Sequence, residues 1–235
     1  MNYSEYTEII SSRLALESPP VALSFVESPP TGIRQPDEDV PAGCAFWRKA
    51  EAGVFYAPAE AHFNCPIGSM TMGFDMPPNI MQELMSLVEN MTGCGYIGPE
   101  EAANVPSVPG QKSGIVYGPL AQFSLAPDLV LLWLSPRQAM IFQEAAGRCS
   151  WTETIPAGIF GRPACAALPM AKQSRQATLS LGCTGMRTFT EIADDRMLAI
   201  LPGDQIAQFS GALDQAVDVN ASMKEFYEGR KQQFS

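Results

Sequence analysis

One stretch of this chain limits its fold more than any other: the six consecutive apolar residues Leu129–Leu134, followed at once by Ser135 and Pro136. A strand that is apolar on both faces is typical of a sheet covered on both sides. Ser135 can cap a helix, and Pro136 suits its first position because no backbone N–H is needed there. This strand–turn–helix unit favours an α/β (or α+β) fold, a single mixed sheet with flanking helices, over an all-β sandwich.

Apolar periodicity and turn residues predict the remaining elements. The predicted helices cover residues 3–16, residues 78–91, residues 136–147, a segment from Asp204 to Val217, and a last segment that Asn220 caps and that carries Met223, Phe226 and Tyr227. The predicted strands are Val21–Val26, 54–56, 114–117, Leu129–Leu134, Ile159–Phe160, 178–181 and 196–201. Neither a low-complexity linker nor an internal repeat interrupts them, so we expect one domain over residues 1–235.

Charge and hydropathy exclude several classes of function. Twenty-five acidic against fifteen basic side chains give a formal charge of -10, and no basic stripe is present to attract nucleic acid or an anionic membrane surface. No apolar run approaches the roughly 20 residues of a membrane-spanning helix. The first residues, Met1 to Glu5, lack the basic region of a secretory leader, so we expect a cytoplasmic protein.

Six cysteines in a reducing compartment are expected to be buried thiols, metal ligands or reactive thiols rather than disulfides. Four of them lie in loops that also carry glycine or proline, which lets backbone approach a sulfur closely. These four are Cys44, Cys65, Cys165 and Cys183. The chain has no Cys-x-x-Cys spacing, so a four-cysteine site would have to be assembled from distant segments. We expect Cys94 and Cys149 to be structural thiols.

Charged neighbours and one histidine accompany these cysteines. Arg48, Arg162 and Arg187 each lie within four residues of one of the four. Such charges can lower thiol pKa values, offset the charge of a thiolate-bound cluster or bind ligand carboxylates, although surface arginines also fall near cysteines by chance. His62, the only histidine, precedes Cys65 by three residues. It is a candidate metal ligand, and the alternative is a histidine bonded to backbone beside a buried thiol.

Six of the twelve methionines lie between residues 70 and 91. Thioethers can bind Cu(I) or haem iron, but such a run more often packs a core. Met81 and Met85 share one face of the predicted helix, so we expect them to pack there.

Common enzyme signatures are missing from the chain. It contains neither a P-loop nor a Gly-x-Ser-x-Gly elbow, and its one Gly-x-Gly-x-x-Gly, at residues 93–98, follows a predicted helix instead of a strand. A thiol enzyme with Cys65 or Cys183 as nucleophile stays open, since a cysteine needs only a lowered pKa to react.

Four motifs, taken in order, are similar to those of a known family. They are Gly43-Cys44-Ala45-Phe46-Trp47, His62-Phe63-Asn64-Cys65-Pro66-Ile67-Gly68, Gly161-Arg162-Pro163-Ala164-Cys165 and Gly182-Cys183-Thr184-Gly185-Met186-Arg187. The chain resembles the domain of unknown function 169 family, found in many anaerobic archaea and bacteria, over nearly its whole length. The resemblance implies that Cys44, Cys65, Cys165 and Cys183 stand at family motif positions, and it implies no activity.

Three functions therefore stand as expectations. The first is a redox protein, served by a redox partner protein, that holds an iron–sulfur cluster, with 4Fe-4S favoured, through some or all of the four motif cysteines. The second is a haem or other tetrapyrrole carrier, with His62 or a methionine as axial ligand, arginines 48, 162 and 187 on ring carboxylates, and Phe46, Trp47 and Phe63 as walls. The third is the thiol enzyme.

We also expect a homodimer. The methionine-rich helix, and Phe226 and Tyr227 near the C-terminus, offer apolar surface suited to self-association, and two-fold dimers are the commonest closed oligomers. The alternative is that these side chains fill the core of the monomer.

Overall fold

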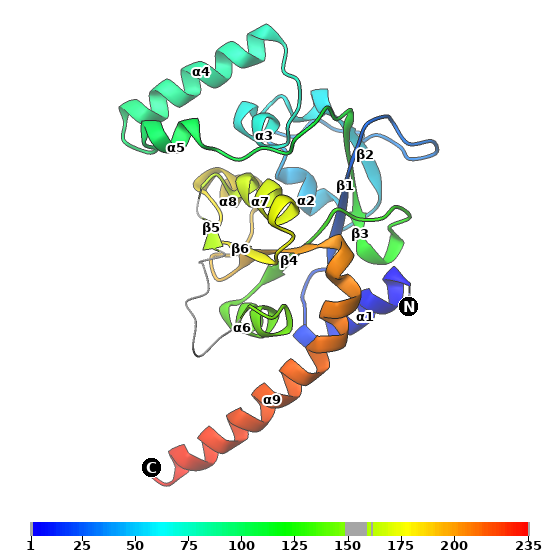
Figure 1. The fold of residues 1–235 in the computed structure, drawn as a ribbon, viewed down its shortest axis with the longest axis vertical. Helices are drawn as coiled ribbons and strands as arrows, with labels where there is room; N and C mark the ends of the chain where they lie inside the picture. Colours follow the sequence, from blue (N-terminus) through cyan, green and yellow to red (C-terminus); the bar gives the residue numbers. More distant parts are fainter. Residues whose placement is uncertain (1, 149–158, 161, 235) are drawn as a thin grey trace.

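The computed structural model describes residues 2–148, 159–160 and 162–234. In these residues one seven-stranded sheet runs in the order β2-β3-β1-β4-β7-β6-β5, with β5 and β6 parallel and the other neighbours antiparallel (Figure 1). The strands are β1 (Val21–Val26), β2 (Phe55–Pro58), β3 (Gly114–Pro119), β4 (Leu129–Leu134), β5 (Ile159–Phe160), β6 (Thr178–Ser180) and β7 (Met197–Pro202). The predicted single mixed sheet with flanking helices is confirmed.

β4 lies at the centre of this sheet, between β1 and β7, and all six of its residues are buried. Its alternate side chains enter two different cores: Leu131 and Trp133 belong to one, and Leu132 and Leu134 to the other. An apolar run without alternation is what a strand between two cores requires. The prediction that Leu129–Leu134 forms a covered central strand is confirmed.

Two groups of helices cover the two faces of the sheet (Figure 1). One face, which we call the closed face, is covered by α1 (Tyr3–Leu14), α6 (Pro136–Ala145) and α9 (Ile206–Gln232). The other, the cavity face, is covered by α2 (Ala45–Lys49), α7 (Ala167–Ser174) and α8 (Thr184–Thr190), with α3 (Pro66–Thr71), α4 (Pro78–Gly93) and α5 (Pro99–Ala103) beyond them. Short 3-10 turns are η1 (Ala59–His62), η2 (Leu120–Gln122), η3 (Ala164–Ala166) and η4 (Gly203–Gln205).

The start of α6 has the predicted cap. The Ser135 hydroxyl accepts from the backbone N–H of Gln138, and the Gln138 side chain accepts from the backbone N–H of Ser135 at 2.7 Å. Pro136 occupies the first turn. This reciprocal pair satisfies two N–H groups that a helix start otherwise leaves without partners, and it fixes where β4 ends and α6 begins.

The C-terminal region differs from the prediction of two helices. α9 continues from Ile206 to Gln232 without a break. Asn220 does not cap a helix: its side-chain amide donates to the carbonyl of Ala216 at 2.8 Å, so it lies within one. The prediction is wrong because an asparagine side chain can be satisfied by the preceding turn as well as by a helix start. Asp204 lies in η4, where it pairs with Arg175.

α4 exists as predicted, but its methionines do not pack a core. Met81 and Met85 are 43% and 56% exposed, and Leu84 is the buried residue of the helix. The prediction of core packing is wrong because α4 lies away from the sheet (Figure 1). Its residues Val88 and Met91 instead line the cavity described below. Among the described residues, no helix is both long and apolar enough to cross a membrane.

Candidate functional site

The four motif cysteines line one cavity of about 220 Å³ on the cavity face. They reach it from four separate segments: Cys44 lies directly before α2, Cys65 directly before α3, Cys183 directly before α8, and Cys165 in η3. The rest of the lining is mainly apolar. The tertiary structure therefore brings together the thiols that the sequence motifs singled out.

Burial sets the acidity of these thiols. It raises the pKa of Cys44 from 9.0 to about 12, and the nearby Cys65 and Cys183 add to the shift because a second thiolate would repel the first. Burial also raises the pKa of Cys65 and of Cys165, with a further contribution from Cys183 in both cases. These three thiols are protonated at neutral pH, and their mutual influence places the sulfurs in one shared environment.

Hydrogen-bonding groups lie beside all four sulfurs. The backbone N–H of Met186 donates to Cys183 Sγ at 3.4 Å. For the other thiols, whose pKa burial raises, the groups that lower the pKa are the backbone amides of Ala45 for Cys44 and Gly68 for Cys65, and the Thr71 hydroxyl for Cys165. Donors directed at sulfur stabilise a thiolate, so the cavity is suited to thiolates once a positive charge enters it.

Two glycines allow the chain to pass close to this site. A Cβ atom on Gly68 would lie 3.3 Å from Cys65 Sγ. Gly182 has a φ of +82°, and a Cβ there would lie 2.1 Å from the Met186 side chain. A side chain at Gly68 would press on the Cys65 sulfur, whereas one at Gly182 would displace the Met186 side chain, so the expected close approach to a cysteine sulfur holds at Gly68.

His62 lies at the cavity wall but both of its ring nitrogens are engaged. Nδ1 donates to the carbonyl of Pro58 at 2.9 Å, and Nε2 accepts from the Tyr117 hydroxyl at 3.1 Å. Burial lowers the pKa of His62 to about 4, so the ring is neutral. This is the geometry of a histidine bonded to its surroundings, the alternative weighed from the sequence, and a metal at Nε2 would have to displace Tyr117.

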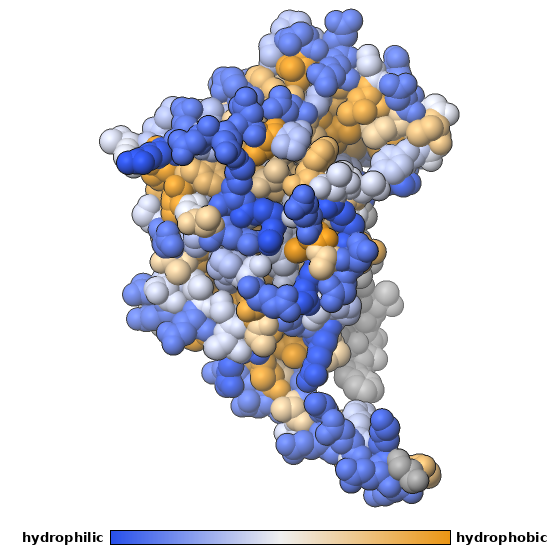
Figure 2. Space-filling view, turned by 180° about the vertical axis from the view of Figure 1, so that it is seen from behind, coloured by the Kyte–Doolittle hydropathy of each residue, from blue (hydrophilic) through white to orange (hydrophobic). Residues whose placement is uncertain are grey.

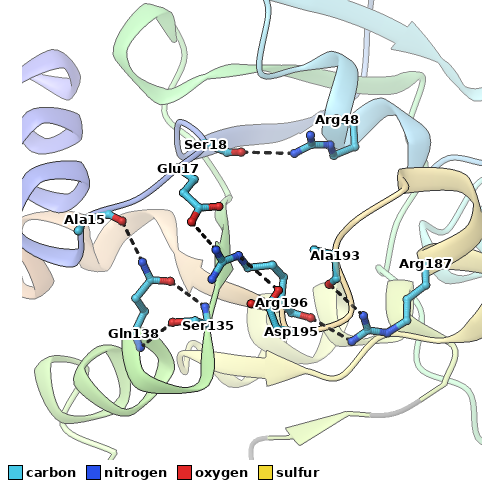
Figure 3. A network of polar contacts seen from close by, with 10 residues as sticks. All are labelled: Ala15, Glu17, Ser18, Arg48, Ser135, Gln138, Arg187, Ala193, Asp195 and Arg196. Atoms are coloured by element: carbon cyan, nitrogen blue, oxygen red, sulfur yellow. Dashed lines mark hydrogen bonds and ion pairs between the residues drawn. The ribbon is translucent and has the colours of Figure 1, made fainter.

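Of the three predicted cofactor-binding arginines, two contact other parts of the fold (Figure 3). Arg48 pairs with Glu51 and lies 3.4 Å from the Ser18 hydroxyl. Arg187 donates to backbone carbonyls, among them those of Leu181 at 2.7 Å and Arg196 at 3.0 Å. Neither arginine lines the cavity. Closeness of an arginine to a cysteine in the sequence therefore did not predict that the arginine lines the cavity. The long arginine side chain reaches whichever acceptors the fold brings near it.

Arg162 is the predicted arginine that does line the cavity. Its guanidinium carbon lies 4.2 Å from the centre of the Tyr96 ring, a cation–π contact. Trp47 also lines the cavity as predicted, whereas Phe46 lies behind it and stacks on Tyr117 with ring centres 5.7 Å apart. Phe63 packs against the core of this face.

The sequence did not predict that α4, α5 and the chain between and after them cover the cavity. This α4–α5 cover, residues 78–105, contributes one side of the lining: Val88, Met91, Tyr96, Ile97, Ala102 and Val105. The broad apolar stripe of the helix was the available signal. It indicated that α4 must face something apolar, and only the fold shows that it faces a cavity instead of the sheet.

Among the described residues, no three cysteine, histidine, aspartate or glutamate side chains are close enough together to hold one metal ion. The four thiols thus border a common space without converging on a single point in it.

The family model of DUF169, described as uncharacterised ArCR, COG2043, matches residues 9–210. The chain belongs to the DUF169 family. All four cavity cysteines lie within the DUF169 match, whereas most of α9 lies beyond it. Comparison with curated proteins and with solved structures gives no match.

Of the two remaining cysteines of this DUF169 protein, the structure describes Cys94. Cys94 is exposed at the end of α4, with its sulfur 3.5 Å from the carbonyl of Met91, and it does not line the cavity. Cys149 lies outside the described residues. Cys94 is therefore a natural control for experiments on the four cavity thiols.

Proposed function

We propose that this DUF169 protein is a redox protein that holds an iron–sulfur cluster, with 4Fe-4S favoured, through Cys44, Cys65, Cys165 and Cys183. The observation that carries the proposal is the meeting of these four thiols, from four distant segments, on one buried and mainly apolar cavity. Cysteine thiolates are the usual ligands of such clusters. When bound, the cluster supplies one-electron transfer, and a redox partner protein would exchange electrons with it.

The described residues offer no ready site for a single metal ion. A tetrahedral zinc ion holds four sulfurs at about 2.3 Å, which puts them roughly 3.8 Å from one another. No such gathering of ligands exists in the described part of the chain. A cluster of several metal ions spreads its ligands around a larger centre, and the cavity of about 220 Å³ offers roughly the liquid volume of seven water molecules for it.

The residues around the four sulfurs would set the reduction potential of the bound cluster. N–H and O–H groups beside the four sulfurs would stabilise thiolate charge, and Arg162 lines the same cavity. The apolar lining, including Trp47 and Met91, makes the surroundings of the half-buried sulfurs less polar. Hydrogen bonds, local charge and solvent exposure are the terms by which a protein sets the potential of a cluster.

The cavity fits a tetrapyrrole less well than it fits a cluster. Pockets for ligands of that size class occupy about 300–1,000 Å³, more than the space found here. The proposed axial ligand His62 has both ring nitrogens bonded, and Arg48 and Arg187 are directed elsewhere. A methionine ligand stays open, since Met70, Met72, Met91 and Met186 line the cavity.

The site also supports a thiol enzyme less well than a cluster. A cysteine nucleophile needs a lowered pKa, and burial raises the pKa of Cys65 instead. Cys183 accepts a backbone N–H bond and stays the better candidate for a nucleophile.

Purification without oxygen tests the proposal. We expect a coloured protein with about four iron and four sulfide per chain, as a 4Fe-4S cluster contains. Cys65→Ser and Cys165→Ser should each lose most of the iron, whereas Cys94→Ser, which changes an exposed thiol outside the cavity, should keep it. Thermal unfolding of each variant shows that the loss is not one of folding.

Two results would contradict the proposal. One is a colourless protein that takes up no iron from ferrous ion and sulfide under reducing conditions. The other is equal iron loss in the cavity variants and in Cys94→Ser, which would mark the iron as non-specifically bound. A Soret band after haem addition, absent in His62→Ala, would favour the tetrapyrrole instead.

A further inference from the structure

The last part of α9 extends beyond the body of the molecule (Figure 1). Ile206, Phe209 and Leu213 are buried in the core of the closed face, but every residue from 221 to 234 is exposed. We call residues 221–234 the α9 arm. An isolated helix of this length is only marginally stable in water, so a helix that leaves its own core gains from a partner.

The apolar side of this arm continues the stripe that buries the start of the helix. The stripe steps alternately by four and three residues, which is the heptad spacing of packed helices. Its apolar members are Phe209, Leu213, Ala216, Met223 and Tyr227, and the polar Asn220 occupies the remaining position. Met223 and Tyr227 are 42% and 61% exposed, although they occupy the same side as the buried Leu213. Viewed from behind, the arm presents a mainly hydrophilic surface (Figure 2), so the apolar surface is confined to part of its circumference.

A groove follows this stripe between α9 and α6. Its floor includes Met140 and Ile141 from α6 and Met223 and Tyr227 from α9. Met140 is itself 47% exposed. The groove thus lies along the arm, and one of its two walls is the arm.

We propose that the occupant of this groove is the α9 arm of a second copy of this chain, packed antiparallel about a two-fold axis. The α9 stripe of one copy forms a wall of its groove, and the same stripe of the second copy would occupy that groove. Such a surface is self-complementary, as a two-fold interface requires. In this arrangement each arm covers the Met223 and Tyr227 of the other. Three helices then pack together at each end of the interface: one α6 and the two arms.

The surface area that a stable dimer must bury indicates that the second arm contacts α6 as well as the first arm. A 14-residue arm is about 21 Å long, and one side of it offers on the order of 300 Å². Stable interfaces bury about 800 Å² on each partner. Two arms crossing alone would fall short, so α6 must add its own apolar surface, of which the half-exposed Met140 is a part.

Charge around the groove also suits this occupant. Arg137, Lys224, Lys231 and Glu228 line it, so positive charges outnumber negative ones, and Lys224 pairs with Glu228 at 3.4 Å. The arm also carries Glu225, so an antiparallel copy can present a further carboxylate to the groove. Such exposed pairs contribute little energy, but they favour one orientation over the other. The arm lies beyond the DUF169 match, so the inference concerns this chain and not the family.

Light scattering on the full-length protein tests the inference. At micromolar concentration we expect twice the 25.4 kDa mass of one chain. Met223→Glu should give the mass of one chain, because it puts a charge into the centre of the apolar contact. Met140→Glu should do the same, because it changes the groove and leaves the arm intact. Met85→Glu is the matched control: it alters an exposed methionine on α4 and should stay dimeric.

Each other outcome would overturn a stated part of the inference. A wild-type mass of one chain, or a dimeric Met223→Glu, would overturn the interface. Dissociation by Met223→Glu but not by Met140→Glu would overturn the seating in the groove. Dissociation by Met85→Glu would place the contact on α4 instead. Unchanged circular dichroism and iron content in each variant separate these outcomes from unfolding and from loss of the proposed cluster.

Discussion

The two faces of the sheet are built from the same strands and are used differently. On the closed face, three helices pack directly on the strands, and Phe142 of α6 meets Phe209 of α9 with ring centres 5.2 Å apart. On the cavity face, helices surround a space with four thiols on its wall, and a buried histidine lies beside it. A filled core stabilises the chain, whereas an unfilled space gives up packing contacts to leave room for a ligand.

Deleting one ring on each face is the strongest test of this difference. Phe142→Ala should lower the free energy of unfolding by about 3–5 kcal/mol, because the ring is fully buried in the closed face. Phe189→Ala, at the cavity wall, should cost less than about 1 kcal/mol, since the ring is 40% exposed. Urea unfolding of both variants measures the two values. Equal losses would mean that the cavity face is as tightly packed as the other.

Alkaline pH should weaken the cavity face through Cys44. Its folded-state pKa of about 12 lies above its ordinary value of 9.0, so the folded state keeps a proton that the unfolded state loses. The contribution of Cys44 is complete below pH 9 and falls by about 1.4 kcal/mol per pH unit as the pH rises toward 12. Cys44→Ser should show a shallower loss than Cys94→Ser in metal-free protein. Parallel curves for the two variants would contradict the burial of this thiol.

Acidic pH should weaken the same face through His62. The folded-state pKa of about 4 lies below the ordinary 6.5, so only the unfolded state binds a proton between these values. Stability should therefore fall by about 1.4 kcal/mol per pH unit as the pH drops from 6.5 toward 4. His62→Gln, which cannot titrate, should flatten this part of the curve. An unchanged slope would show that other groups dominate acid unfolding.

The smallest expected effect concerns the helix cap on the closed face. Ser135→Ala should cost about 1 kcal/mol, because it removes the side-chain partner of the Gln138 N–H. Ser222→Ala, on the exposed α9 arm, is a control that should change stability far less. A Ser135 effect no larger than that of Ser222 would show that packing alone sets the start of α6. The measurement is thermal unfolding of both variants under the same conditions.

Much of the fold was predictable because it depends on neighbours along the chain. The strand Val21–Val26 and the central strand Leu129–Leu134 have the predicted bounds, since apolar runs between turn residues are local signals. The Ser135 cap is equally local. The two C-terminal errors have the same origin: Asp204 and Asn220 are suitable cap residues, but Arg175 and the Ala216 carbonyl satisfy them differently.

The sequence alone singled out four of the six cysteines, because Cys44, Cys65, Cys165 and Cys183 stand in distinctive glycine- and proline-bearing motifs. Only the tertiary structure decided that these four share one cavity, that the α4–α5 cover encloses it, and that Arg162 alone of the three predicted arginines lines it. The physical reason is distance along the chain. Motifs and periodicity describe contacts between near neighbours, whereas a cavity is the space left when segments far apart in sequence pack on one sheet.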